Sequence, residues 1–144
     1  MKISKENLTE WAVNYIKSRD IIARAITGIE MGKEGWDIVV HAKDGDRFYA
    51  VVPEISSFDE IAQKAGDRAV CIVTYNTRHN LDRLVDGWSR LSALPKLSLI
   101  FANPKSSLDQ KWLIVPYTHE FVTEKASLKR GLKAMFDMVE EWRG

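Results

Sequence analysis

The sequence predicts a mixed α/β fold in which a central mixed β-sheet, with an antiparallel meander, carries helices on both faces. Two almost unbroken apolar runs, residues 69–75 and 97–102, are typical of strands that are covered on both faces. The pair Asp44-Gly45 between two further runs is typical of a β-hairpin loop. Apolar residues at helical spacing lie before and after these strands, which predicts helices packed on the sheet.

The length and composition predict one domain. A chain of 144 residues with 45% hydrophobic content can close a single core. Apolar residues recur from Leu8 to Trp142 without a Pro-rich or Ser-rich linker, so we expect residues 1–144 to form a single domain. The formal net charge of +1 gives no overall attraction to nucleic acid or to an anionic membrane. Any nucleic-acid site must therefore be a local patch.

The single cysteine and the absence of long apolar runs predict where in the cell the protein is located. Cys71 has no intrachain disulfide partner and lies in an apolar run, where a small buried thiol is the ordinary interpretation. The first ten residues are polar, and no apolar run approaches the roughly 18 residues that span a bilayer. We therefore expect a cytoplasmic protein that is neither exported nor inserted in a membrane.

The first half of the chain is expected to form a helix, a three-stranded meander, a short helix and a buried strand. Asn7 with Glu10 can form a capping box at the start of the first helix. Ser57 with Glu60 is a second capping box, and it opens the short helix that Gly66 can end. The expected bounds are a first helix ending near residue 20 and strands over residues 21–29, 36–42, 47–53 and 69–75.

The second half is expected to add a helix, two strands and a last helix. An apolar stripe from Leu81 to Leu91 predicts the helix, which Pro95 prevents from continuing. The expected strands cover residues 97–102 and 111–117. Thr123 or Ser127 is expected to cap the last helix, whose apolar stripe reaches Trp142. The resulting order, α-β-β-β-α-β-α-β-β-α, predicts a mixed sheet between helices.

An acidic residue stands near the start of the second expected strand, at Asp37. The order α-β-β-β-α-β with this Asp, over about half the chain, resembles the core of the restriction-endonuclease-like (PD-(D/E)XK) superfamily. In that superfamily an Asp on the second strand and a Glu or Asp on the third bind a divalent metal. A Lys two residues after the second carboxylate activates the attacking water. The resemblance thus implies a metal-dependent phosphodiesterase that uses Mg²⁺ or Mn²⁺ and acts on DNA or RNA.

The register of the hairpin decides which residues stand at the motif positions. The expected register pairs Lys43 with Asp46 across the turn. Stepping outward, Asp37 then faces Val52, and Glu54 lies on the same face of the sheet. The motif would read Asp, Val, Glu where the family has Asp, Glu, Lys. This departure implies a degenerate or rearranged site, with two carboxylates separated by about 7 to 8 Å at the backbone and able to share a hard cation.

The candidate catalytic residues are Asp37, Glu54 and Lys64, and the candidate metal ligands are Asp37 and Glu54. Lys64, on the helix that follows the hairpin, would replace the missing Lys, and His41 lies on the same strand face as Asp37. The alternative for Asp37 is structural, namely a salt bridge to Arg24 on the first strand. The alternative for Glu54 is a solvated residue at a strand end.

A basic cluster on the last helix is the candidate nucleic-acid contact. It consists of Lys125, Lys129, Arg130 and Lys133. Such a cluster can bind phosphates of DNA or RNA, with an affinity that falls as the salt concentration rises. The alternative is a solvated helix face that binds nothing.

Other chemistries find no support in the sequence. The histidines lack the spacing of a zinc site, and neither a nucleophile motif nor a phosphate-binding glycine loop is present. The sequence therefore predicts a nuclease-like domain that binds nucleic acid, with its cleavage activity lost or rearranged. The alternative is a non-enzymatic module for protein interaction or self-association, for example as a homodimer, on the same scaffold. A small-molecule enzyme is a third, less favoured hypothesis.

Overall fold

Six strands form one mixed sheet in the computed structural model, which describes residues 4–144. The strands lie side by side in chain order and are β1 (Ile26–Lys33), β2 (Trp36–Ala42), β3 (Gly45–Val51), β4 (Ala69–Tyr75), β5 (Leu97–Ala102) and β6 (Lys111–Ile114). β1, β2 and β3 form an antiparallel meander, β3, β4 and β5 run parallel, and β6 is antiparallel to β5. The predicted mixed sheet with an antiparallel meander is confirmed.

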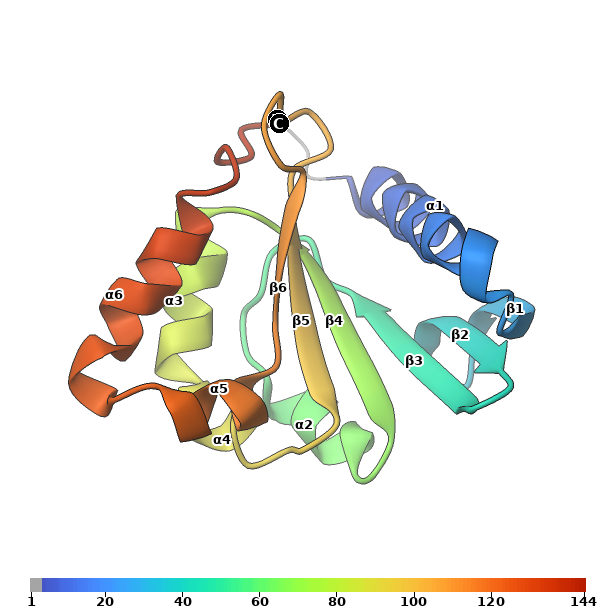
Figure 1. The fold of residues 1–144 in the computed structure, drawn as a ribbon, viewed down its shortest axis with the longest axis horizontal. Helices are drawn as coiled ribbons and strands as arrows, with labels where there is room; N and C mark the ends of the chain where they lie inside the picture. The colour runs from blue at the N-terminus through green and yellow to red at the C-terminus, as the bar shows by residue number, and fades with distance from the viewer. Residues whose placement is uncertain (1–3) are drawn as a thin grey trace.

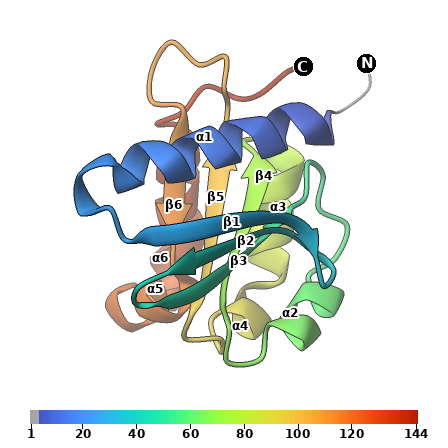
Figure 2. The ribbon, with the colours of Figure 1, turned by 90° about the vertical axis from the view of Figure 1, so that its right-hand side faces the viewer.

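Helices pack on both faces of this sheet. They are α1 (Lys5–Ala23), α2 (Asp59–Ala65), α3 (Arg78–Asp86), α4 (Trp88–Leu91), α5 (Pro116–Val122) and α6 (Lys125–Phe136). α1 lies on one face, and α3 and α6 lie on the other (Figure 1). Figure 2 shows α1 crossing the sheet, with β1–β3 at a steep angle to β4–β6. None of the helices in residues 4–144 combines the length and apolar character that a membrane span requires.

The two faces of β4 explain why its sequence is almost entirely apolar. Val70 and Ile72 belong to the larger buried cluster, which also contains residues of α3, α4 and α6. Cys71 and Val73 face the opposite way, into a cluster with the apolar side of α1. Because side chains alternate along a strand, burial on both faces requires an unbroken apolar run. The predicted bounds of β2, β4 and β5 are confirmed to the residue.

The end of α1 corrects the prediction of a strand over residues 21–29. The helix continues to Ala23, so that Ile21 and Ile22 are helical and 69% and 94% exposed. Arg24 then adopts a left-handed conformation, with φ of 48°, and ends the helix. The carboxylate of Asp20 accepts the amide hydrogens of the two residues that follow Arg24. Ile21 and Ile22 thus belong to the end of a helix, although their β-branched side chains are also compatible with a strand. Residue propensity alone does not distinguish the two structures.

The helix starts also differ from the expected caps. Ser4, not Asn7, caps α1 and accepts the amide hydrogen of Asn7 at 3.1 Å. α2 begins one residue after Phe58, and α6 begins after Glu124 instead of after Thr123 or Ser127. Each cap lies within a few residues of the expected one, which is the usual uncertainty of helix ends.

The C-terminal third contains two further differences. The expected strand over residues 111–117 stops at Ile114, because Pro116 starts α5. The last helix ends at Phe136, and Trp142 lies beyond it, stacked on Tyr75 with ring centroids 3.8 Å apart. The expected apolar stripe therefore does not belong to a single helix, because its last residues, up to Trp142, lie in a segment that is not helical.

His41 connects β2 to both of its neighbouring strands. Its Nδ1 lies 2.9 Å from a carboxylate oxygen of Asp46 on β3, and its Nε2 contacts the carboxylate of Glu30 on β1. The hydrogen bond to Glu30, followed by that to Asp46, raises the pKa of His41 above its usual value of 6.5. Both ring nitrogens can donate only when the imidazole is protonated on both and positively charged.

We expect the contribution of His41 to stability to depend on pH. A raised pKa means that the folded state binds the proton more tightly, so the contribution is complete below about pH 6.5 and is lost as the pH rises through the folded-state pKa. The difference in melting temperature between the wild type and His41→Gln should be larger at about pH 6 than at about pH 9. A difference that is independent of pH would contradict this.

Candidate functional site

The register of the β2–β3 hairpin differs from the predicted one by two residues. Ala42 pairs with Gly45 and Ile38 pairs with Tyr49. Continuing this register by one residue brings Asp37 opposite Ala50, not Val52. The side-chain faces are unchanged, because two residues is one full period of a strand. In the motif that the resemblance implies, Ala50 would therefore stand at the second carboxylate position and Val52 at the Lys position.

Asp37 is half-buried at the start of β2 and makes two structural contacts. Its Oδ2 accepts the amide hydrogen of Val51 at 2.7 Å, and its Oδ1 lies 2.8 Å from Nζ of Lys5 on α1. The alternative partner expected from the sequence, Arg24, is instead the residue that ends α1. Asp37 thus holds the last amide of β3 and joins the hairpin to the first turn of α1.

Glu54 and Lys64 have other neighbours. Glu54 lies beyond the end of β3, is exposed, and has His79 Nε2 at 3.9 Å from its carboxylate. Strand alternation therefore does not extend to Glu54, which corrects the basis for placing it beside Asp37. Lys64 donates from Nζ to the carbonyl oxygen of Gly35 at 2.8 Å and lies over the ring of Trp36. These residues make structural contacts, and a catalytic role for them stays a prediction.

The residues at the motif positions do not form the oxygen-rich ligand set that Mg²⁺ or Mn²⁺ takes in proteins. Both oxygens of Asp37 are engaged, and the side chains of Ala50 and Val52 carry no oxygen. In the part of the chain from residue 4 to residue 144, no group of three or more His, Cys, Asp or Glu side chains could hold a metal ion.

A pair of substitutions tests the structural contacts of Asp37. Asp37→Ala is expected to lower the free energy of unfolding by about 1 to 2 kcal/mol, because it leaves the amide of Val51 without its acceptor and Lys5 without its partner. Asp37→Asn keeps an acceptor oxygen and should cost less. Glu54→Ala, at an exposed site, should stay within about 0.5 kcal/mol of the wild type in urea unfolding. Equal losses in the two alanine variants would contradict this role of Asp37.

The basic cluster lies on α6, far from Asp37. Figure 1 shows α6 and β2 at opposite sides of the molecule. Lys125, Lys129 and Arg130 are exposed, whereas Lys133 pairs with Asp137 at 2.8 Å. The structure therefore brings the cluster together on one helix but does not bring it to the predicted catalytic residues.

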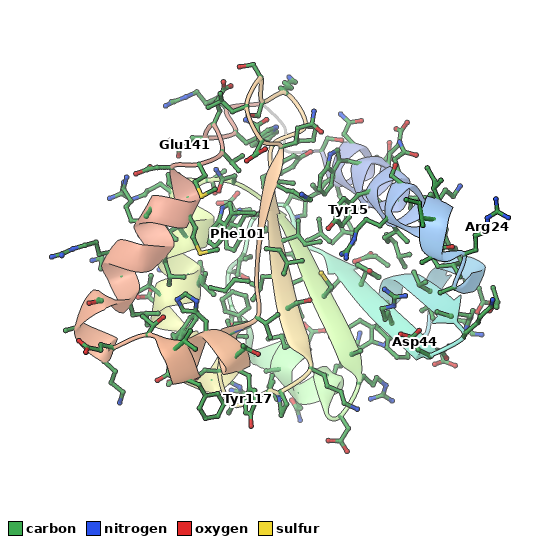
Figure 3. The ribbon with its side chains drawn as sticks, viewed as in Figure 1. Tyr15, Arg24, Asp44, Phe101, Tyr117 and Glu141 are labelled. Atoms are coloured by element: carbon green, nitrogen blue, oxygen red, sulfur yellow. The ribbon has the colours of Figure 1, made fainter. Side chains whose placement is uncertain are left out.

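A second basic site, which sequence reasoning missed, lies under the C-terminal half of α1. We call it the basic hollow. Its cations are Arg19 of α1, Arg47 of β3 and Lys96, which immediately precedes β5, and they line a cavity of about 140 Å³. Tyr15, also in its lining, lies between α1 and the sheet (Figure 3). These cations are spread over almost 80 positions, so no local motif could have revealed the site.

Comparisons with protein-family models, curated proteins and solved structures found no match to this chain.

Proposed function

We propose that this chain is a nuclease-like domain that binds nucleic acid and has lost metal-dependent cleavage. The observation that carries the proposal is the arrangement of the first six elements. A helix, three antiparallel strands, a helix and a fourth strand parallel to the third follow one another, and the four strands are adjacent in chain order. This is the order on which the resemblance to restriction-endonuclease-like nucleases rests.

The motif positions support the loss of cleavage. Two of the three chemically active positions hold the apolar residues Ala50 and Val52. The remaining one, Asp37, is used to hold the end of β3 and the start of α1. A carboxylate committed to an amide and an ammonium group has less capacity to bind a cation. The presence of an Asp at position 37 is thus explained by its structural contacts.

The exposed part of the α6 cluster supports binding of nucleic acid. Lys125, Lys129 and Arg130 have no carboxylate within ion-pairing distance among residues 4–144. The buried residues Leu132 and Phe136 anchor the other side of α6. Three free cations on an anchored helix can contact successive phosphates, and each such contact releases counterions.

Charge reversal on α6 tests the binding. We expect Lys129→Glu/Arg130→Glu to weaken binding of fluorescent single- and double-stranded DNA and RNA by about tenfold or more, and to lower the salt dependence by roughly two phosphate contacts. Lys17→Glu/Lys43→Glu changes the net charge equally at two exposed lysines, one in α1 and one in the β2–β3 turn, and is the matched control. Fluorescence anisotropy at several salt concentrations measures both. Equal effects of the two variants, or no binding by the wild type, would contradict the proposal.

The loss of cleavage is tested with the same oligonucleotides. Incubation with Mg²⁺ or Mn²⁺ should leave them intact, and neither ion should raise the melting temperature of the protein. Cleavage that disappears in Asp37→Ala would show that the activity is retained and would overturn this half of the proposal.

Exposed apolar residues favour self-association as a second candidate function. Phe121 and Val122, at the end of α5, are 73% and 79% exposed. Large apolar side chains that lie together on a surface mark interaction sites. Light scattering of the full chain would detect a dimer, and Phe121→Ser should dissociate it if this surface is the interface.

A further inference from the structure

We propose that the basic hollow binds a phosphate group. The site is separate from the α6 cluster, and the proposal does not depend on the proposed function. Its floor is the face of the sheet that α1 packs against, where Tyr49, Cys71 and Ser98 line the cavity. α1 is the one helix packed against this face in the buried cluster, and its C-terminal half forms the roof with Tyr15 and Arg19.

The volume of the hollow is large enough for a phosphate group. A cavity of about 140 Å³ is roughly tenfold larger than the space that one water molecule needs. A neighbouring hollow of about 230 Å³ shares Tyr15, Arg19, Arg47 and Tyr49 with it. A phosphate group therefore fits in the smaller cavity, and the larger one has room for what the phosphate is attached to.

The cations of the hollow are not neutralised by ion pairs. Among residues 4–144, no carboxylate lies within ion-pairing distance of Arg19, Arg47 or Lys96. They come from α1, from β3 and from the residue before β5, and all three line the cavity. Arginine and lysine are both common partners of phosphate oxygens. Arginine is especially suited to phosphate, because its planar guanidinium donates in a fixed geometry.

The two arginines of the hollow differ in what their side chains contact. Nε of Arg47 is buried and has no hydrogen-bond partner within residues 4–144, as is also true of Nε of Arg83 and Nε2 of His119. Arg19 is held in place from the opposite side, because its Nη1 donates to the hydroxyl of Tyr15 at 3.2 Å. Arg19 is thus held against Tyr15, and both arginines line the cavity.

The remaining polar groups of the floor carry no negative charge. Burial raises the pKa of Tyr49 to about 12 and that of the Cys71 thiol to about 12. Both groups are therefore protonated at neutral pH and do not repel an anion. Cys71 is accordingly not a thiolate nucleophile, and the site is one of binding instead of covalent catalysis.

Two acidic residues lie close by and limit where the anion can sit. Asp20 and Asp44 line the neighbouring hollow, not the smaller cavity. Asp20 is committed to two backbone amides at the end of α1, and Asp44 lies in the β2–β3 turn (Figure 3). Repulsion from these carboxylates favours the side of the hollow next to Lys96, where Ser98 adds a hydroxyl donor.

Titration with inorganic phosphate at constant ionic strength, followed by ¹H–¹⁵N NMR, tests the site. We expect saturable shifts of amides around Arg47, Cys71 and Ser98. Lys96→Gln removes one exposed cation without touching the core, and it should weaken binding about five- to tenfold. Lys43→Gln, an exposed lysine in the hairpin turn, is the matched control and should bind like the wild type. Absence of saturable shifts, equal weakening by both variants, or equal binding of acetate would overturn the proposal.

Two further arms distinguish the sources of the phosphate. A nucleoside 5′-monophosphate presents a phosphomonoester, and a dinucleotide presents a phosphodiester such as a nucleic-acid backbone provides. Tighter binding of either one than of inorganic phosphate, weakened in Lys96→Gln, supports the site and identifies its ligand class. The α6 variant Lys129→Glu/Arg130→Glu should bind phosphate in the hollow like the wild type. Loss of nucleic-acid binding in that variant and loss of phosphate binding in Lys96→Gln are therefore separate results.

Discussion

Replacing Asn76 with Leu is expected to destabilise the protein by about 3 kcal/mol or more, because several buried hydrogen-bonding groups lose their partner at once. Asn76 follows β4 and is completely buried. Its Nδ2 donates to the carbonyl oxygens of Phe136 and Val139 at 3.2 and 3.0 Å, and its Oδ1 accepts from Trp112 Nε1 at 2.7 Å. One side chain thus ties the end of α6 and the edge strand β6 to the centre of the sheet.

A second substitution tests whether the amide group of Asn76, and not its volume, stabilises the protein. Asn76→Asp keeps the volume but replaces the amide donor, so it should also destabilise strongly and more so as the pH rises and the new carboxyl ionises. Asn14→Leu, at an exposed position of α1, makes the same change without burial and should stay within about 0.5 kcal/mol of the wild type. Urea unfolding measures each variant. A loss below about 1 kcal/mol for Asn76→Leu would show that water or a rearranged backbone satisfies these groups.

Phe101→Ala is expected to cost about 3 to 5 kcal/mol, because it opens a cavity in the larger buried cluster. Phe101 lies on β5, is completely buried, and stacks on Trp112 with ring centroids 4.3 Å apart. Figure 3 shows Phe101 in the interior, between the sheet and helices α3 and α6. The removed ring leaves a space that neighbouring side chains fill only in part.

Phe121 provides the matched control for this change. It is the same residue type at 73% exposure, so Phe121→Ala should alter the free energy of unfolding by no more than about 0.5 kcal/mol. Both variants are compared by urea unfolding at the same pH. Similar values for the two would mean that the core around Phe101 collapses onto the vacant space, contrary to the expectation for a close-packed interior.

The strands of the interior could be predicted because their signal is local. β4 and β5 are short apolar runs bounded by charged or turn residues, and burial on both faces leaves few other interpretations. The helix and strand boundaries near Ile21 and Ile22 could not be predicted in the same way. Their β-branched side chains are compatible with a strand, and the helix continues through them because Asp20 and Arg24 provide a helix end just beyond.

The hairpin register was predicted wrongly for a physical reason. A shift of two residues keeps every side chain on the same face, so the hydrophobic pattern of β2 and β3 is satisfied in either register. Only the turn and the neighbouring strand distinguish the two. The error changed the residue opposite Asp37 from Val52 to Ala50, and with it the interpretation of the catalytic motif.

The sequence by itself determined the fold class, the buried strands and the basic cluster on α6, because each depends on residues that are neighbours along the chain. The tertiary structure alone decided that Asp37 pairs with Lys5 and that Arg19, Arg47 and Lys96 surround one cavity. These groupings arise when the sheet brings distant segments together. Contacts of that kind are set by packing across the sheet, and no periodicity or spacing in the sequence encodes them.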